Sequence, residues 1–396
     1  MRDDPHSHDP EPYGSNSHGS CSGGSCSGGP ERPRALILSA YDVGSHRRWR
    51  QQLVACQPAY DWQVLTLPPR FFRWRIRGNA LSWLREPALS RPWDLLVVTS
   101  MVDLATLKGL QPQLAKVPTL LYMHENQFAY PESAGQHQSI DPQLVNLYSA
   151  IAADRVAFNS EWNRQSFLTA VDALLRKLPD AVPAGVVDSI RAKSLILPVP
   201  LEDRLFVSRQ HPHNRDEPHL LWNHRWEYDK APGRLLALLQ RLESQGQRFR
   251  LSVVGERFRS QPPEFEAIRS RFGHRLEHWG FLEDRDSYDT LLARADVVVS
   301  TALHDFQGLA MLEAMASGCL ALAPDRLAYP EYVPEHQRYP SHPTDEGAEA
   351  RAAAHCLTAL LDADASPMPP RQWSLSHLGP RYRELLAELV AQQASE

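Results

Sequence analysis

The run Asp296-Val-Val-Val-Ser300 is followed by Gly308-Leu-Ala-Met-Leu-Glu-Ala-Met-Ala-Ser317 and then by Cys319-Leu-Ala-Leu-Ala323. The first and last of these runs are short and apolar, which is typical of strands buried on both faces of a parallel sheet. The middle run is long enough for a helix and opens on a glycine after a polar loop. The stretch therefore predicts a strand–helix–strand unit within a parallel α/β sheet.

The same alternation of apolar runs and helical patterns extends outward from this stretch. We expect further strands at residues 34–40, 62–67, 93–99, 118–124, 154–159, 194–198, 219–223, 249–255 and 276–280, and helices at 47–55, 160–177, 232–244, 264–271 and 285–293. Doubly wound sheets of this kind bind ligands at the carboxyl ends of their strands. We therefore predict an α/β protein of two Rossmann-like domains that face a central cleft.

Composition divides the chain further. A polar segment at 202–217 has the character of a linker. We expect a disordered Gly/Ser/His/Cys tail at 1–32, domains at 33–205 and 206–370, and a C-terminal helix at 371–396 that packs back on one of them. The tail holds possible ligands for a soft metal ion: His6, His8, His18, Cys21 and Cys26. No tight Cys-x-x-Cys spacing fixes a tetrahedral site there, so a flexible linker is the plainer interpretation.

The overall composition excludes several classes of protein. The chain has 396 residues, 42% hydrophobic, with a net charge of −5. This apolar content supports a core, and the mild negative charge argues against a polybasic coat over nucleic acid. No apolar run approaches the ~18–20 residues needed to span a bilayer, so we expect no stable membrane association. Five cysteines and the absence of a secretory signal pattern favour a reduced, cytoplasmic compartment.

Polar side chains gather after two strands of the C-terminal domain. Asn223, Arg225 and Lys230 follow the strand at 219–223. Two cations near a helix start can neutralise a diphosphate, although Glu227 and Asp229 could instead pair with them on a solvated loop.

The loop after the strand at 296–300 is the second such group. Asp305 lies on this loop, and we expect the free amides of Gly308, Leu309 and Ala310 to suit a phosphate. Glu313 is an acid among apolar residues, so it requires a polar partner such as a ribose diol. Its alternative role, an acid favoured by the helix dipole, is weaker because Glu313 lies past the first turn.

The N-terminal domain offers two further groups. His124, Asn126 and Gln127 follow the strand at 118–124 in one dense polar run. A lone histidine is usually structural, but a polar cluster at a strand end favours contact with a ligand. Gly44 follows the first strand and allows the backbone to approach a ligand, although this loop does not match G-x-G-x-x-G.

Residues 70–77 interleave arginines with aromatic residues. The run carries Arg70, Arg73, Trp74, Arg75 and Arg77, and residues 33–100 hold ten arginines against four acids. Guanidinium groups bind phosphates, and aromatic faces stack on unpaired bases, so the run fits a single-stranded RNA loop. An anionic membrane surface or a merely solvated Arg-rich face are the alternatives.

These groups together resemble the GT-B glycosyltransferases of family 4. That pattern has an Arg and a Lys at this spacing, two acids separated by seven residues, and an N-terminal-domain histidine. The resemblance implies that Arg225 and Lys230 hold the donor diphosphate, that Glu313 holds the ribose and Asp305 the sugar, and that His124 lines the reaction face. Asp305 stands where the family usually has Glu. The resemblance also implies a retaining reaction without a metal or other cofactor.

Longer runs are similar to the tRNA-queuosine α-mannosyltransferase family. They are residues 67–77, 122–131, 158–160, 222–230 and 324–331. The resemblance spans about Arg34 to Pro334. It implies GDP-mannose as co-substrate and the cyclopentenediol of queuosine in tRNA as acceptor, with the acceptor bound by the domain at 33–205 and the nucleotide sugar by the domain at 206–370.

The expected activity is thus retaining mannosyl transfer to queuosine in tRNA. The expected catalytic residues are His124, Arg225, Lys230 and Asp305. The expected donor-binding residues are Gly44, Asn223, Arg225, Lys230, Gly308, Leu309 and Glu313. The expected acceptor-binding residues are Arg70, Arg73, Trp74, Arg75, Arg77, Asn126 and Gln127. Two alternatives remain open: transfer from another nucleotide sugar to a lipid or glycan, and a non-catalytic RNA-binding module. The sequence leaves the oligomeric state undetermined.

Overall fold

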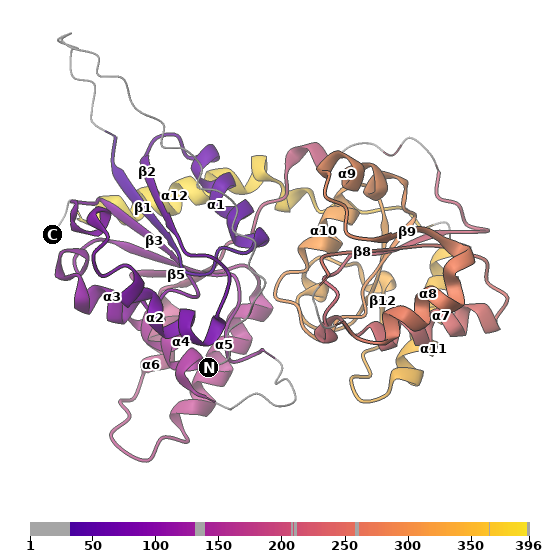
Figure 1. Ribbon diagram of the computed structural model, residues 1–396, viewed down its shortest axis with the longest axis horizontal. Coiled ribbons are helices and arrows are strands. Elements are labelled where there is room, and N and C mark those ends of the chain that lie inside the picture. The colour runs from indigo at the N-terminus through magenta and orange to yellow at the C-terminus, as the bar shows by residue number, and fades with distance from the viewer. Residues whose placement is uncertain are drawn as a thin grey trace, which may run out of the picture. The chain divides into compact units, whose positions relative to one another are not determined.

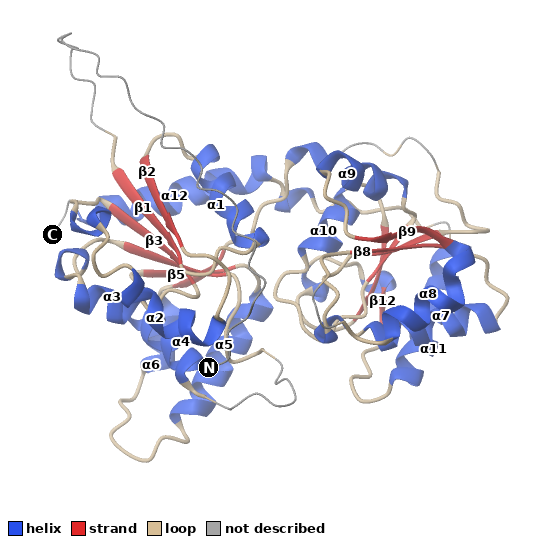
Figure 2. Cartoon of the chain, viewed as in Figure 1, coloured by secondary structure: helices blue, strands red, loops and turns tan. Residues whose placement is uncertain are grey.

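The computed structural model describes residues 32–130, 139–206, 209, 212–257, 261–363 and 365–393. The disordered tail expected at 1–32 therefore lies outside the described residues except for Arg32. Residues Pro33–Glu396 form one compact unit. Within it lie two six-stranded sheets, each with helices on both faces (Figures 1 and 2).

The first sheet, with its helices, is called here the N-terminal half. Its strands are ordered β2-β1-β3-β4-β5-β6, and all neighbours are parallel. The strands are β1 Arg34–Ser39, β2 Asp61–Thr66, β3 Leu95–Thr99, β4 Thr119–Met123, β5 Arg155–Phe158 and β6 Ser194–Ile196. The helices are α1 Gly44–Cys56, α2 Phe72–Ser82, α3 Leu104–Leu110, α4 Asp141–Ala152, α5 Glu161–Leu175 and α6 Val186–Ala192.

The second sheet, with its helices, is the C-terminal half. Its strand order is β12-β11-β10-β7-β8-β9, again all parallel. The strands are β7 His219–Trp222, β8 Arg250–Val254, β9 Leu276–Gly280, β10 Val297–Val299, β11 Leu320–Pro324 and β12 Arg338–Tyr339. The helices are α7 Pro232–Ser244, α8 Glu264–Phe272, α9 Arg285–Arg294, α10 Leu309–Ala316 and α11 Glu346–Asp362.

The period of two along each strand builds two apolar layers on every sheet. Leu36 and Leu38 of β1 face a cluster that includes helices α2 to α6. Ala35 and Ile37 face the opposite way, towards α1 and the C-terminal helix α12 Leu375–Gln393. The inner strands are thus covered on both faces, which explains why β3 and β4 are almost entirely apolar, whereas the edge strand β2 is only partly buried.

Helix α12 packs on the sheet of the N-terminal half, although it follows the C-terminal half in the chain (Figure 1). Tyr382 lies at the centre of this contact. Its hydroxyl accepts a hydrogen bond from Trp49 Nε1 at 2.9 Å and donates to the Pro198 carbonyl at 3.0 Å. Leu386 is fully buried in the same cluster. The last described helix therefore packs on the first described strand of the chain.

The two halves also bond to each other through loops. The Glu331 carboxylate accepts hydrogen bonds from the amides of Glu161 and Trp162, at 3.0 and 2.8 Å. These amides open α5, so an acid of the C-terminal half caps a helix of the N-terminal half. The Gln307 side chain bonds both the amide and the carbonyl of Val199, at 3.0 and 2.9 Å. The Gln307 bonds hold the loop at 300–308, and the Glu331 bonds hold a second loop, against the N-terminal half.

Candidate active site

The order of the second sheet brings two of the predicted loops together. Strands β7 and β10 are neighbours although they are not consecutive in the chain, so their connections diverge at this point. Lys230, which follows β7, donates a hydrogen bond through Nζ to the carbonyl of His304 at 2.6 Å. The same ammonium lies 3.8 Å from the Asp305 carboxylate. The structure thus unites Lys230 and Asp305 at the topological switch point of the sheet.

Asp305 and Gly308 form a tight turn that starts α10. The Gly308 amide donates to Asp305 Oδ1 at 3.0 Å. Gly308 has a φ of +77°, and a Cβ there would lie 2.1 Å from the Tyr332 hydroxyl oxygen, so only glycine fits. The expectation that this amide is free for a phosphate is therefore not met, because Asp305 already occupies it. Leu309 and Ala310 lie in the first turn of α10, where amides have no acceptor within the helix.

The charge state of Asp305 follows from its neighbours. Burial raises the pKa of its carboxyl, but Lys230 and two histidines lower it more, so the pKa lies below the ordinary value. The histidines are His224 and His304, both buried. Burial, with Lys230 second, lowers the pKa of each to about 4. At neutral pH the group therefore holds an anionic Asp305 beside two uncharged imidazoles.

Glu313 is almost fully buried, and its carboxylate is enclosed by polar partners. Arg48 of α1 bonds Oε1, Arg285 approaches the same oxygen at 3.3 Å, and the Tyr288 hydroxyl donates to Oε2 at 3.3 Å. Burial raises the pKa of Glu313, but Arg48 and Arg285 lower it below its ordinary value. Glu313 is thus held as an anion, and one of its cations comes from the N-terminal half.

Asn223 belongs to the same network. Its Nδ2 donates to the Tyr288 hydroxyl at 3.0 Å and to the Ala310 carbonyl at 2.9 Å. Its Oδ1 is buried and has no hydrogen-bond partner among the described residues. A buried amide oxygen of this kind is available to a donor from a ligand.

Arg225 and Lys230 differ in their surroundings. The Arg225 side chain is 43% exposed and pairs with Glu227 at 3.0 Å, whereas Lys230 is buried and pairs with Asp229 at 3.2 Å. The sequence allowed ion pairs with Glu227 and Asp229 as an alternative to phosphate binding. Both ion pairs are present in the structure. A polyphosphate could compete with these carboxylates for the two side chains.

His124 lies in an aromatic stack with His46. Their ring centroids are 4.1 Å apart at an interplanar angle of 16°. His46 Nε2 lies 2.9 Å from Glu125 Oε2, and Ser100 donates to the other oxygen of Glu125 at 2.8 Å. Burial, aided by His46, lowers the pKa of His124 well below its ordinary value. His124 Nε2 and His46 Nδ1 have no partner within the described part of the chain.

Gly44, Asn126 and Gln127 have simpler surroundings. Gly44 is exposed at the start of α1, with open space around the position of a Cβ. Asn126 is fully buried, and its amide bonds Asn163 and Ser166 while its oxygen accepts from the amides of Phe128 and Ala129. With its side chain so occupied, Asn126 holds its loop and offers nothing to an acceptor. Gln127 is half-buried, and its Nε2 lies 3.7 Å from the Met101 sulfur.

The arginine–aromatic run forms the start of α2, and only part of it meets solvent. Arg70, Arg73 and Trp74 are exposed, with Trp74 at 51%. Arg75 is buried instead, because it lies on the face of α2 that points to the core, so its expected contact with RNA is not supported. Arg77 is half-exposed and bonds Asp103 at 2.7 Å.

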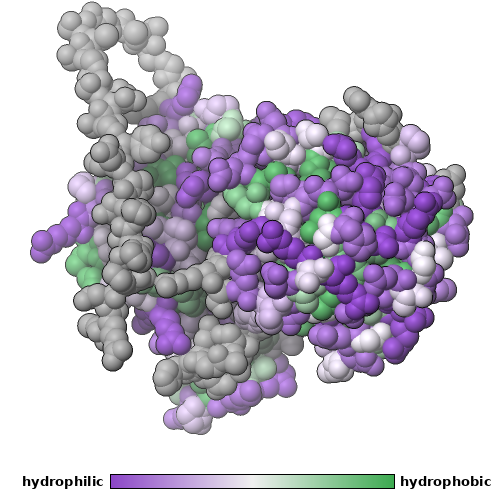
Figure 3. Space-filling model, turned by 45° about the vertical axis from the view of Figure 1, so that its right-hand side comes forward, coloured by the Kyte–Doolittle hydropathy of each residue, from purple (hydrophilic) through white to green (hydrophobic). Residues whose placement is uncertain are grey.

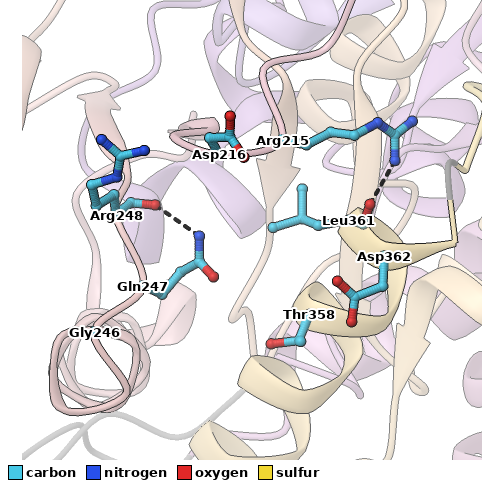
Figure 4. A pocket seen from close by; sticks show the side chains of 8 residues that line it. All are labelled: Arg215, Asp216, Gly246, Gln247, Arg248, Thr358, Leu361 and Asp362. Carbon is cyan, nitrogen blue, oxygen red and sulfur yellow. Dashed lines mark hydrogen bonds between the residues drawn. The ribbon is translucent and has the colours of Figure 1, made fainter.

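A hollow of about 290 Å³ lies elsewhere, as Figure 4 shows. Its lining includes Arg215 and Asp216 before β7, and Gln247 and Arg248 before β8. It therefore lies at the amino ends of these strands, at the sheet edge opposite the predicted site. In the view of Figure 3, the visible face of the C-terminal half is mostly hydrophilic with scattered apolar residues.

Among the described residues, no three His, Cys, Asp or Glu side chains gather as a metal site would require. Nor does any described helix have the length and apolar character of a membrane span. Metal independence remains a prediction from the resemblance.

Comparisons with known proteins identify the family. A family model described as the tRNA-queuosine alpha-mannosyltransferase N-terminal region matches residues 34–201, and the model of glycosyl transferases group 1 matches residues 203–360. A Drosophila melanogaster tRNA-queuosine alpha-mannosyltransferase is 34% identical over 316 residues, which cover 78% of this chain and 84% of that relative. The chain belongs to the tRNA-queuosine alpha-mannosyltransferase family. It is therefore a glycosyltransferase, as the sequence predicts, and not a non-catalytic RNA-binding module.

Solved structures confirm the predicted GT-B fold of this family member. Anabaena HepE in complex with UDP matches with a TM-score of 0.62 at 14% identity, over 90% of this chain and 100% of that one. A sucrose-phosphate synthase from Thermosynechococcus elongatus matches with a TM-score of 0.62 at 17% identity, over 92% and 98%. At such identities the likeness shows the fold alone.

The predicted site of this glycosyltransferase lacked several residues that the structure adds. Arg48, Arg285 and Tyr288 enclose Glu313, while His46 and Glu125 support His124. Three of these had a signal in the sequence. His46 and Arg48 lie just after Gly44, and Glu125 directly follows His124 at a strand end. Arg285 and Tyr288 lie on an ordinary polar helix, where no local pattern distinguishes them.

Proposed function

We propose that this glycosyltransferase moves mannose from GDP-mannose to the cyclopentenediol of queuosine in tRNA, with retention of configuration. The observation that carries the proposal is family membership together with the polar cluster at the β7–β10 switch point. That cluster supplies an anionic carboxylate for a ribose, two cations and two first-turn amides for a diphosphate.

The chemistry of leaving-group departure fits these residues. As the bond from the sugar to the diphosphate breaks, negative charge grows on the departing phosphate oxygen. Lys230 and Arg225, with the amides of Leu309 and Ala310, would stabilise that charge. Asp305 would accept hydrogen bonds from sugar hydroxyls, and Glu313 from the ribose diol. The residues assigned here stabilise the leaving group and orient the sugar.

His124 is proposed to contact the sugar near the reacting carbon. Its lowered pKa keeps the imidazole neutral near pH 7, so one ring nitrogen can donate and the other accept. The stack with His46, which Glu125 orients, fixes the position of the ring. A neutral and immobile ring suits hydrogen bonding to a hydroxyl.

The test is mass spectrometry of tRNA incubated with the protein and GDP-mannose. We expect a hexose mass gain that is confined to the queuosine nucleoside and absent from tRNA that lacks queuosine. The proposal would be overturned if no preparation of tRNA gained a hexose mass. A parallel panel of other nucleotide sugars, with lipid and glycan acceptors, distinguishes the alternative transferase: preferred transfer from one of these would replace GDP-mannose or tRNA in the assignment.

A further inference from the structure

Aromatic side chains outside the proposed donor site line its mouth. Tyr130, on the loop after β4, is 43% exposed. Its ring lies 4.7 Å from that of His304 and 6.2 Å from that of Phe306, between ring centroids. His304 and Phe306 flank Asp305 in sequence, so one face of Tyr130 rests on the loop that carries the proposed sugar-binding carboxylate. The remaining part of the ring meets solvent.

A second aromatic group lies at the start of α2. Tyr41, on the loop after β1, is half-buried and meets Phe72 edge to face, with centroids 6.1 Å apart. Burial raises the pKa values of both Tyr41 and Tyr130, that of Tyr130 to about 12, and Arg225 opposes the rise in each case. Both hydroxyls therefore lie within electrostatic reach of the same guanidinium.

The residue before Phe72 supports a role for this surface. Phe71 has a φ of 54°, in the left-handed region that a bulky residue adopts at a cost of about 1–2 kcal/mol. Its side chain is nevertheless 71% exposed, so burial within the chain does not offset this strain. Arg70 lies over the Phe71 ring, with 5.7 Å between the guanidinium carbon and the centroid. Strained residues of this kind are concentrated at binding sites.

We propose that the exposed part of the Tyr130 ring forms a subsite for one unpaired nucleobase of the acceptor RNA, and that Tyr41, Phe71 and Phe72 offer further aromatic faces to the same RNA. The inference rests on the proposed function and extends it, since Tyr130 is not among the proposed donor-binding residues, although its side chain bonds Arg225. A base must leave its neighbours in the RNA to bring a substituent to the transferred sugar, and an aromatic face compensates for the lost stacking.

The surrounding charges fit RNA. Arg70 and Arg73 are exposed at the start of α2, where they can meet phosphates, and Arg225 is partly exposed beside both tyrosines. His304, against which Tyr130 rests, is uncharged at neutral pH because burial lowers its pKa to about 4. Cations that can bind the phosphate backbone and uncharged rings that can stack on the base together suit an unpaired nucleotide.

The test measures RNA affinity in the absence of any donor. The full-length protein is titrated against a fluorescent RNA hairpin with an unpaired anticodon loop that lacks queuosine. We expect Tyr130→Ala to weaken binding roughly 5- to 150-fold, the range for loss of one base–aromatic stack. Tyr130→Phe should bind within about threefold of the original chain, because stacking needs the ring and not the hydroxyl. Met368→Ala, which removes another exposed apolar side chain, is the control.

Three outcomes would overturn the subsite. They are an unchanged affinity in Tyr130→Ala, an equal loss in Tyr130→Phe, and a loss of GDP-mannose affinity without a loss of RNA affinity. The last would assign Tyr130 to the donor. If the original chain binds the hairpin through Tyr130 but adds no hexose to queuosine tRNA, the proposed function fails while the subsite stands.

Discussion

At the scale of single residues, Glu313 shows how this protein keeps a carboxylate charged in a buried place. A buried carboxylate without polar partners would gain a proton or destabilise the fold. Arg48, Arg285 and Tyr288 supply charge and hydrogen bonds that satisfy both oxygens. A ribose that binds here must share or replace these partners, so donor affinity depends on the anionic form.

We predict that Glu313→Gln raises the Kd for GDP-mannose about tenfold or more. The amide presents one neutral acceptor oxygen where the carboxylate has two charged ones, so the ribose diol loses a hydrogen bond to a charged group, worth about 1.5–3 kcal/mol. Isothermal titration of the purified protein measures this. Glu266→Gln, at an exposed position on α8, is the matched control and should bind normally. Equal affinities for both variants would remove Glu313 from the donor site.

At the scale of elements, α12 packs on the first sheet although it follows the second sheet in the chain. It brings Leu378, Leu385, Leu386 and Leu389 to the face of the first sheet that α1 also covers. Its polar residues face solvent, so this one amphipathic helix closes a layer that would otherwise expose apolar strand residues. The helix therefore contributes to the stability of the N-terminal half, although it lies far from that half in the sequence.

Leu386→Ala should lower the free energy of unfolding by about 2–5 kcal/mol, since it removes a fully buried side chain and leaves a cavity. Urea denaturation followed by circular dichroism measures the change. Glu388→Ala lies on the exposed side of the same helix and should stay within about 0.5 kcal/mol of the original chain. A similar small effect for Leu386→Ala would show that α12 is not packed as described.

At the scale of the whole molecule, several buried histidines connect stability to pH. Burial lowers the pKa values of His219, His224 and His304 to about 4. In the unfolded chain these rings titrate near 6.5, so between pH 6.5 and about 4 the unfolded state binds more protons than the folded state. Acid therefore favours unfolding in this window.

We expect the free energy of unfolding to fall as pH decreases from 6.5 towards 4, by up to about 1.4 kcal/mol per pH unit for each of these histidines. Urea titrations at pH 7, 6 and 5 measure the slope. His219→Asn, at a position away from the active site, should reduce the slope by one histidine's share, whereas the exposed His355→Gln should leave it unchanged. A stability that is flat across this window would contradict the buried neutral state.

The sequence by itself determined the architecture. Short apolar runs such as 95–99 and 297–299 are typical of strands covered on both faces, and parallel strands place their following loops at one sheet edge. For this reason the sequence alone predicts that Lys230, Asp305 and Glu313 lie at one edge of the sheet. The sequence patterns predict no helix at the positions of α2 and α11. Helix α2 has no clear apolar stripe, while α11 carried an N-cap at Asp345 and an alanine-rich run that signal a helix.

Only the tertiary structure decided the partners of these residues. Arg48 and Glu313 are 265 residues apart and meet because the two halves bond to each other. The turn of α2 buries Arg75 and exposes Arg73, although the sequence presents them alike. Local periodicity sets which segments form helices and strands, because it concerns neighbours in the chain. Which charges pair, which amides are already occupied and which rings reach solvent depend on contacts between distant segments, and only the folded chain brings those segments together.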